Sequence, residues 1–488
     1  MTSGTASLSL GRASVRGAAW IAAAGIASKF VSVAVQFALG WLLGEGDFAI
    51  YGTAISLTVF TSALTDGGVQ KLLRQQPHRY SELVGSAVAV SAVSAVLGAA
   101  ILTVFAFASP KLYGTESIKP LVLVLAANVP VTAAAAFMRT RLHIDLRFRA
   151  IAIRDAATVF AQGGLTVLLA WSGFGALSFV LPLLAVTAAE AVVLALIGGA
   201  REFNLGGITA ASVRAIVRSS GWIMLASACG VLVLRGDYLA MGFVAESMLG
   251  YYFFGFQLAA STMTLLTSGA YGVLLPALSR VASEPIRLRV AFERATRLAA
   301  FLIAPGGVFI AIAGPAAVHL LWKGRWDEAI PVVQAVALSA SMRGLAVVSG
   351  AGVEAAGRWR LRAGIEAIDG VSLVATILVA VGMGGSLAQV AIAVGLQRIA
   401  AGVLHLSAAS AAVGCGAFAS FPWYGPFLLP AFAAFGLAEL IGTSMRLPGE
   451  SMLGAAVRLA SFAAMWTPVI AFWGRRELGE LRAIRRVG

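Results

Sequence analysis

Apolar runs long enough to cross a lipid bilayer recur from one end of this chain to the other. A helix of about 20 apolar residues spans the ~30 Å of hydrocarbon in a membrane. The runs are too long and alternate too little for barrel strands, so we predict an all-α polytopic membrane protein with about fourteen transmembrane helices. The approximate limits of these spans are 18–43, 48–70, 83–108, 118–138, 151–171, 176–199, 219–243, 247–276, 298–321, 329–352, 365–383, 386–412, 424–444 and 452–473.

The basic residues predict the orientation of these spans. With the N-terminus in the cytoplasm and the sides alternating, 25 of the 36 Lys and Arg residues fall in cytoplasmic segments and 5 in external loops. Such a bias is typical of membrane proteins, and it accounts for the net charge of +14 without a nucleic-acid partner. We therefore expect both termini to be cytoplasmic, with the first apolar run retained as a span.

Two pairs of similar segments indicate an internal repeat. The segments 147–155 and 360–369 both place a basic doublet before an apolar run that carries an acid, and Glu45 and Tyr51 are spaced like Glu246 and Tyr252. Chance similarity between apolar segments is the alternative. A repeat of six spans keeps the orientation, so we predict two parallel six-helix bundles with a central cavity, followed by two extra helices. The predicted parts are a cytoplasmic segment 1–17, bundles 18–217 and 218–412, the added helices 413–474 and a basic cytoplasmic tail 475–488.

Buried cations within the spans predict an anionic substrate. Ionisable groups in a membrane are costly, and they usually face a cavity or a partner. Arginine suits phosphate because its planar fork can form two parallel hydrogen bonds. The alternative is that these cations pair with buried acids and tie helices together. The candidate substrate-binding residues are Lys29, Arg235, Gln257, Arg343 and Arg398, with Gln257 meeting sugar hydroxyls.

Three carboxylates are candidates for ion coupling or gating. Asp66, Glu190 and Asp237 lie within predicted spans, where burial can bring a carboxylate into a useful titration range. The coupling ion would be H⁺ or Na⁺. No P-loop, nucleophile elbow or zinc-ligand motif occurs, and His405 and the other histidines show no ligand spacing, so we expect a transporter with no cofactor and no metal.

Two cytoplasmic features are predicted to meet membrane lipids. The arginines of the doublets at 147–149 and 360–362 are expected to set topology and to contact anionic head groups. The loop 278–297 is predicted to form a surface amphipathic helix, because Arg287, Arg289, Glu293, Arg294 and Arg297 have near-helical spacing; a solvated connector is the alternative.

Several short motifs, in matching order, resemble one transporter family. The segments 43–48, 64–70, 141–149, 234–239 and 275–280 are similar to those of Wzx-type polysaccharide flippases, which belong to the multidrug/oligosaccharidyl-lipid/polysaccharide (MOP) exporter superfamily. The resemblance covers about residues 15–410. Asp66 and Asp237 fall on these motifs, whereas Lys29 and Arg343 match none, and their substrate role depends on the cavity argument alone.

The resemblance implies a V-shaped pair of bundles that works by alternating access. It implies undecaprenyl-pyrophosphate-linked oligosaccharides as substrates, flipped across the bacterial inner membrane for exopolysaccharide or O-antigen synthesis. The polysaccharide polymerase and the chain-length machinery are the expected partners. A MATE-like drug exporter is the nearest alternative, although Lys29, Arg343 and Arg398 disfavour cationic drugs. A membrane-embedded polymerase or ligase would need a large external loop, and a scaffold would be expected to lack cavity charges.

Overall fold

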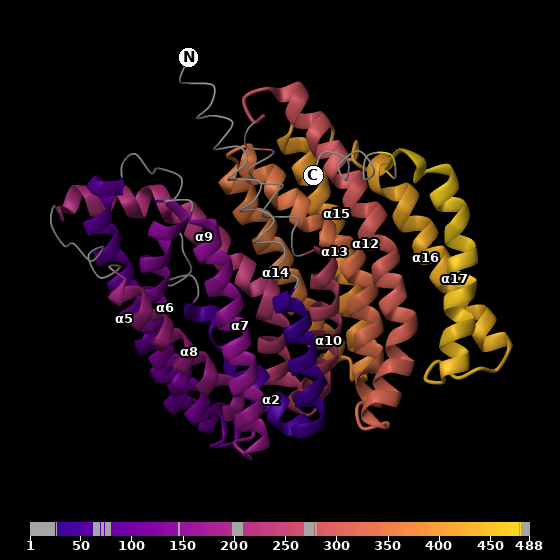
Figure 1. The fold of residues 1–488 in the computed structure, drawn as a ribbon, viewed down its shortest axis with the longest axis horizontal. Coiled ribbons are helices and arrows are strands. Elements are labelled where there is room, and N and C mark those ends of the chain that lie inside the picture. The colour runs from indigo at the N-terminus through magenta and orange to yellow at the C-terminus, as the bar shows by residue number, and fades with distance from the viewer. Residues whose placement is uncertain are drawn as a thin grey trace. The chain divides into compact units, whose positions relative to one another are not determined.

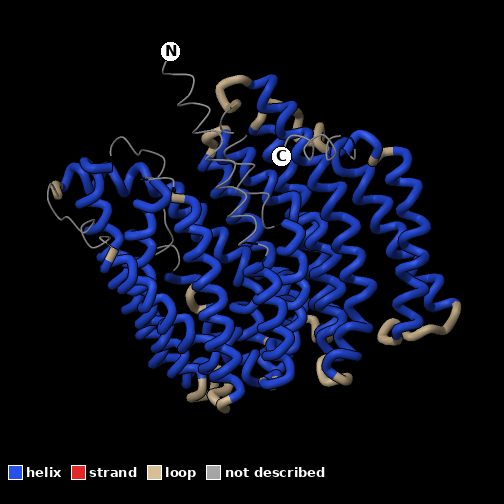
Figure 2. The backbone as a smooth tube through the Cα atoms, viewed as in Figure 1, coloured by secondary structure: helices blue, strands red, loops and turns tan. Residues whose placement is uncertain are grey.

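A computed structural model describes residues 27–61, 80–144, 147–197, 208–267 and 281–477, together with the single residues 25, 69, 73, 278 and 479. Within these ranges the chain consists of helices joined by short loops, without a strand (Figure 2). The chain divides into two compact units, Met1–Gly250 (unit 1) and Tyr251–Gly488 (unit 2). The prediction of an all-helical fold is confirmed.

The helices of unit 1 overlap the predicted spans. An apolar helix at Ala27–Leu42 comes first. The others are α2 (Glu45–Ser56), α5 (Tyr80–Tyr113), α6 (Ile118–Ile144), α7 (Phe148–Trp171), α8 (Leu177–Leu196), α9 (Ala210–Val244) and α10 (Glu246–Thr267), the last of which continues into unit 2.

Unit 2 holds the remaining helices (Figure 1). These are α12 (Pro285–Trp322), the short 3₁₀ turn η3 (Asp327–Ala329), α13 (Ile330–Ala355), α14 (Trp359–Gly382), α15 (Leu387–Ala412), α16 (Phe421–Ser444) and α17 (Met452–Phe472). Each of the fourteen predicted spans overlaps one helix of the described part, and ten of these helices are long and apolar enough to cross a membrane.

The two units share one pattern of neighbouring helices. In unit 1, α6 packs against α5 and α8, and α7 packs against α8. In unit 2, α13 packs against α12 and α15, and α14 packs against α15. The two patterns match the correspondence expected from the repeat. The compact units and the predicted bundles differ in α9, which packs on α2 and α5 and is therefore grouped with unit 1.

Several helices begin or end with capping residues. Thr209 and Ser212 form a reciprocal capping box at the start of α9, and Ser386 and Gln389 do the same for α15. Beyond the end of α14, Gly384 adopts a φ of 75°, a left-handed conformation that a side chain would disfavour. These caps satisfy backbone groups that would be costly to leave without partners near lipid.

The amphipathic helix predicted within 278–297 is present from Pro285 onward, but it is continuous with the membrane span that follows it. Residues Pro285–Trp322 form one continuous helix, so the charged segment is the first part of α12, and Pro305 and Pro315 lie inside it. Leu288 and Phe292 are buried there in the hydrophobic core of unit 2. Arg297 donates to Glu477, with Nε and Oε1 2.8 Å apart, and thereby ties α12 to the segment after α17. Tertiary burial extends the helix past the membrane span because one face of the extension has a core to cover.

Close helix approach in unit 2 depends on glycine. A Cβ added at Gly307 of α12 would lie 2.1 Å from Ser341 Oγ and 2.5 Å from the carbonyl oxygen of Ala337, both on α13. A Cβ at Gly402 of α15 would lie 2.4 Å from Cγ of Met342 on α13. Small residues at these positions let helix backbones approach closely, which is how helices associate in lipid.

Gly307→Val should therefore destabilise unit 2 markedly. The added atoms meet a backbone carbonyl, which cannot move aside, so we expect a loss of about 1–3 kcal/mol in stability. Thermal unfolding of the detergent-purified protein measures this loss. Gly436→Ala is the matched control, because a Cβ there meets nothing within 4 Å, and it should leave the melting temperature unchanged. Equal melting temperatures for the two variants would contradict this packing.

Candidate functional site

A buried cluster of charges joins three helices of unit 1. Arg154 of α7 donates two hydrogen bonds to Glu190 of α8, with Nε and Oε1 2.8 Å apart and Nη2 and Oε2 2.9 Å apart. Arg139 of α6 lies with its Nε 3.0 Å from the same Oε1. Arg154 also contacts the neighbouring Asp155, which is half exposed. The Glu190 side chain is 8% exposed, so this carboxylate is a deeply buried acceptor for two permanent cations.

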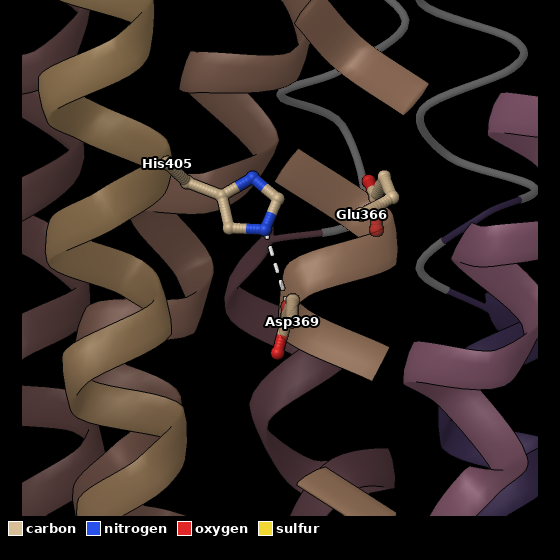
Figure 3. A group of neighbouring side chains, drawn as sticks. All are labelled: Glu366, Asp369 and His405. Carbon is tan, nitrogen blue, oxygen red and sulfur yellow. Dashed lines mark hydrogen bonds and ion pairs between the residues drawn. The ribbon is translucent and has the colours of Figure 1, made fainter. Parts of the chain in front are cut away.

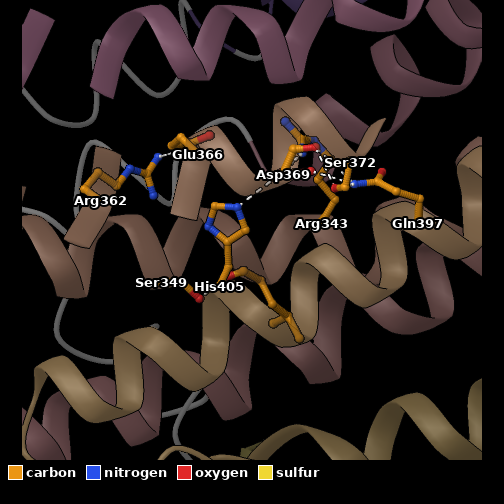
Figure 4. A network of polar contacts seen from close by, with 9 residues as sticks. Arg343, Ser349, Arg362, Glu366, Asp369, Ser372, Gln397 and His405 are labelled. Carbon is orange, nitrogen blue, oxygen red and sulfur yellow. Dashed lines mark hydrogen bonds and ion pairs between the residues drawn. The ribbon is translucent and has the colours of Figure 1, made fainter. Parts of the chain in front are cut away.

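A second buried cluster lies in unit 2 and centres on Asp369 of α14 (Figure 3, Figure 4). Its Oδ2 is 3.1 Å from Nε2 of His405 on α15 and 3.5 Å from Nη1 of Arg343 on α13. Its Oδ1 accepts a hydrogen bond of 3.0 Å from Nε2 of Gln397, which also donates to Ser372. The Asp369 and His405 side chains are 1% and 4% exposed. The cluster thus ties α13, α14 and α15 together through one carboxylate.

The same network extends one turn towards the start of α14. Arg362 lies 2.5 Å from Glu366 and 4.0 Å from Glu354 of α13. Glu366, Asp369 and His405 bring potential metal-ligand atoms to within 4.8 Å of one another. However, each of the two carboxylates already faces an arginine, and such pairing favours an ion-pair network over a metal centre.

The two clusters occupy matching places in the two units. Arg154 and Glu190 lie on adjacent helices and are 36 residues apart, and so are Asp369 and His405. The basic group is on the earlier helix in unit 1 and on the later helix in unit 2. The repeat therefore conserves the position of a buried acid–base pair and reverses its polarity.

Arg235 and Asp237 of α9 have different surroundings. Arg235 donates to the hydroxyl of Thr58, and the described residues give it no acidic partner. Asp237 is fully buried, and its Oδ1 accepts from the backbone N–H of Tyr238 at 3.0 Å. Two residues apart on a helix, the side chains point to different sides.

The other predicted residues fall in several environments. Lys29 and Gln257 are half-buried, on the helix Ala27–Leu42 and on α10. Arg398 is buried on α15, with its guanidinium 4.9 Å from the centre of the Phe256 ring. Asp66 lies outside the described residues. Within unit 2, Arg343 and Arg398 belong to adjacent helices, but Arg343 contributes to the Asp369 cluster. Their role in binding substrate stays a prediction.

Sequence reasoning missed the centre of the unit 2 cluster. His405 shows no ligand spacing in the sequence, and Asp369 is only the acid of the repeated segment 360–369, to which no site was assigned. Arg362 was expected to meet lipid head groups, whereas its side chain is only 20% exposed and pairs with Glu366. The equal spacing of Arg154–Glu190 and Asp369–His405 is the signal that could have identified the pair.

Comparison with known proteins agrees with a helical transporter fold. MurJ, a lipid II flippase solved in an inward closed conformation, matches with a TM-score of 0.72 at 12% identity, covering 93% of this chain and 99% of that one. An inward-facing multidrug resistance MATE family transporter of the MOP superfamily matches at 0.62 and 13%, covering 79% and 94%. The Vibrio cholerae MATE transporter VcmN, in its bent form, matches at 0.51 and 14%, covering 86% and 100%.

These likenesses define the class: a multi-pass, all-helical membrane protein with the fold of MurJ and of MATE transporters. A family described as polysaccharide biosynthesis protein matches residues 38–331, more than half of the chain, so the chain belongs to that family. No curated protein matches the sequence.

Proposed function

We propose that this protein is a flippase for lipid-linked oligosaccharide units in the synthesis of a surface polysaccharide. The observation that carries the proposal is that a member of a polysaccharide biosynthesis family has the fold of a transporter over 93% of its length. The flippase would work by alternating access, with a prenyl diphosphate carrying the glycan from the cytoplasmic to the outer leaflet. The membrane would be a bacterial inner membrane, with both termini in the cytoplasm, and the protein would not be an enzyme.

The diphosphate would be bound by basic side chains that form no ion pair with an acidic residue of the described part. In the described part, Arg139 and Arg154 share Glu190, and Arg343 faces Asp369, whereas Arg235 meets a neutral hydroxyl and Lys29 has no acidic partner. We therefore assign Arg235 and Lys29 the first place among the predicted substrate residues. Gln257, Arg343 and Arg398 complete the proposed set, and a polymerase with its chain-length machinery would receive the product.

Transport of this kind needs a driving gradient, which we assign to a monovalent cation, H⁺ or Na⁺. Among the predicted coupling residues, Asp237 is fully buried and accepts a backbone hydrogen bond, whereas Glu190 is engaged by two arginines. A carboxylate held between two guanidinium groups is better suited to joining helices than to exchanging an ion. These contacts argue against Glu190 as the coupling residue, and Asp237 stays a candidate.

A second candidate function is export of small molecules. The likeness to MATE transporters favours it, since the fold of that group covers 79% of this chain. The two functions differ in where the substrate is made and in what accumulates when the protein is lost, so one experiment separates them.

Deletion of the gene should leave the lipid-linked glycan on the cytoplasmic side of the membrane. We expect the undecaprenyl-linked units to accumulate and the surface polysaccharide to be lost, and a plasmid copy of the gene should restore export. Mass spectrometry of the lipid fraction and staining of the surface glycan measure the two effects. Unchanged surface polysaccharide together with altered dye efflux would overturn the flippase proposal and support a small-molecule exporter.

A further inference from the structure

The buried acid–base pairs of the two units differ in one chemical property. Arginine keeps its charge at every physiological pH, whereas an imidazole is the side chain whose unperturbed titration falls between pH 5 and 8. The pair Arg154–Glu190 of unit 1 is therefore permanently charged on its basic side. The matching pair of unit 2, Asp369–His405, can gain or lose a proton on its basic side.

Protonation of His405 would change the net charge of the network around it. From α13, Arg343 and Glu354 belong to the network, and α14 contributes Arg362, Glu366 and Asp369. Among the described residues of this network, two arginines and three carboxylates leave one negative charge in excess while the imidazole is neutral. Protonation of His405 offsets that excess. On α15 itself, Arg398 lies two turns away and is directed at the Phe256 ring of α10.

The same surroundings disfavour a metal or sodium ion at this place. Each oxygen of Asp369 faces a nitrogen, Oδ1 that of Gln397 and Oδ2 those of His405 and Arg343. Glu366 is engaged by Arg362 at 2.5 Å. A bound cation needs oxygen atoms directed at it and would have to displace these contacts while meeting two guanidinium charges. A proton needs only a nitrogen lone pair.

We propose that the Asp369–His405 pair is the proton-binding site that couples this transporter to a proton gradient, and that Arg154–Glu190 is its fixed counterpart. The inference rests on the proposed function, and it names the coupling ion. With Nε2 of His405 donating to Oδ2 of Asp369, the incoming proton binds Nδ1. The resulting imidazolium–carboxylate pair holds α14 to α15. Loss of the proton to the solvent weakens that attachment and allows the two helices to rearrange.

A ligand-free measurement of conformation tests this proposal. Nitroxide labels are placed at Ser172→Cys and Met383→Cys, two exposed positions in the α7–α8 and α14–α15 turns, in the full chain with Cys229 and Cys415 replaced by alanine. Distance distributions between the labels are recorded by pulsed electron spin resonance at pH 5.5 and pH 8.5, without Na⁺. We expect the ratio of the two main populations to change at least about fivefold, a typical coupling between sites.

Substitutions of His405 test whether this residue causes the pH response. His405→Asn should abolish the pH response, and His405→Arg, which copies the permanent charge of Arg154, should show the low-pH distribution at both pH values. His405→Arg keeps a charged partner for Asp369 and so guards against misfolding of the first variant. His319→Asn is the matched control, since His319 at the end of α12 pairs with Asp327 of η3, both side chains are more than a third exposed, and the change should leave the response intact.

Three results would overturn the proposal. These are a pH response that survives His405→Asn, a change produced by Na⁺ at constant pH, and a His405-dependent change produced by micromolar Zn²⁺. The proposed function fails separately: a normal pH response with unchanged surface polysaccharide in the deletion strain would leave a proton-driven transporter of another substrate. Glycan accumulation in that strain without a pH response would contradict the proton-binding site and leave the proposed function intact.

Discussion

Glu190→Gln should destabilise unit 1 more than any other conservative change in the described charge network. The carboxylate is 8% exposed and holds Arg154 with two hydrogen bonds and Arg139 with one ion pair. Removing one partner of a fully buried ion pair costs about 3–5 kcal/mol, and we expect a cost towards the lower end of that range because Arg154 keeps its contact with Asp155. We expect a strong loss of folded protein, measured by fluorescence-detected size exclusion and by the melting temperature in detergent.

Two further variants separate charge from shape. Asp155→Asn removes an acid that contacts the same Arg154 but is 48% exposed, so it should cost no more than about 1 kcal/mol. Replacing Arg154 and Glu190 together by methionine removes the charges of that pair and should recover part of the lost stability, since Arg139 still loses its contact with Glu190. If Glu190→Gln melts like the parent protein, the cluster does not hold unit 1 together.

Arg235→Ala should lower glycan export roughly ten- to hundredfold, the range expected when a hydrogen bond to a charged group worth about 1.5–3 kcal/mol is lost. Arg235 donates to the neutral hydroxyl of Thr58 and keeps its full charge for an anion. The amount of folded protein should hardly change, because no buried acid loses its partner. Rescue of the deletion strain, followed by quantification of surface polysaccharide over time, measures the export rate.

The controls for Arg235 test charge and position. Arg235→Lys keeps the charge and loses the planar fork, so we expect it to retain an intermediate rate. Lys111→Ala removes an exposed cation at the end of α5 and should export like the parent. Wild-type export by Arg235→Ala would exclude this arginine from the substrate site and would shift the assignment to Lys29 and the cations of unit 2.

The helical elements were predictable because lipid imposes a simple rule. A backbone without water must satisfy its own hydrogen bonds, so each long apolar run becomes a helix whatever its neighbours are. Each predicted span accordingly overlaps a helix of the described part. The same rule does not set where a helix ends outside the lipid, and α12 starts at Pro285 because Leu288 and Phe292 find a core to cover.

The chemistry of the buried charges was only partly predictable. Sequence identified Glu190 and Arg343 as costly groups that need a partner, and it kept pairing between helices as an alternative to a substrate role. In the structure both have a partner of opposite charge, Glu190 in Arg154 and Arg343 in Asp369. The tertiary contacts leave Arg235 with a neutral partner, a difference that depends on helix rotation and cannot be derived from hydropathy.

The sequence by itself determined the class of this protein: an all-helical membrane chain, with two similar halves predicted from its basic corners. Hydropathy and charge act locally along the chain, which is why one sequence sufficed. Only the tertiary structure brought His405 to Asp369, 36 residues away on the next helix, and set that pair beside two arginines and two glutamates. Contact between helices depends on which of their faces pack together. An apolar sequence does not specify these faces, because a leucine side chain is equally well accommodated by lipid and by another helix.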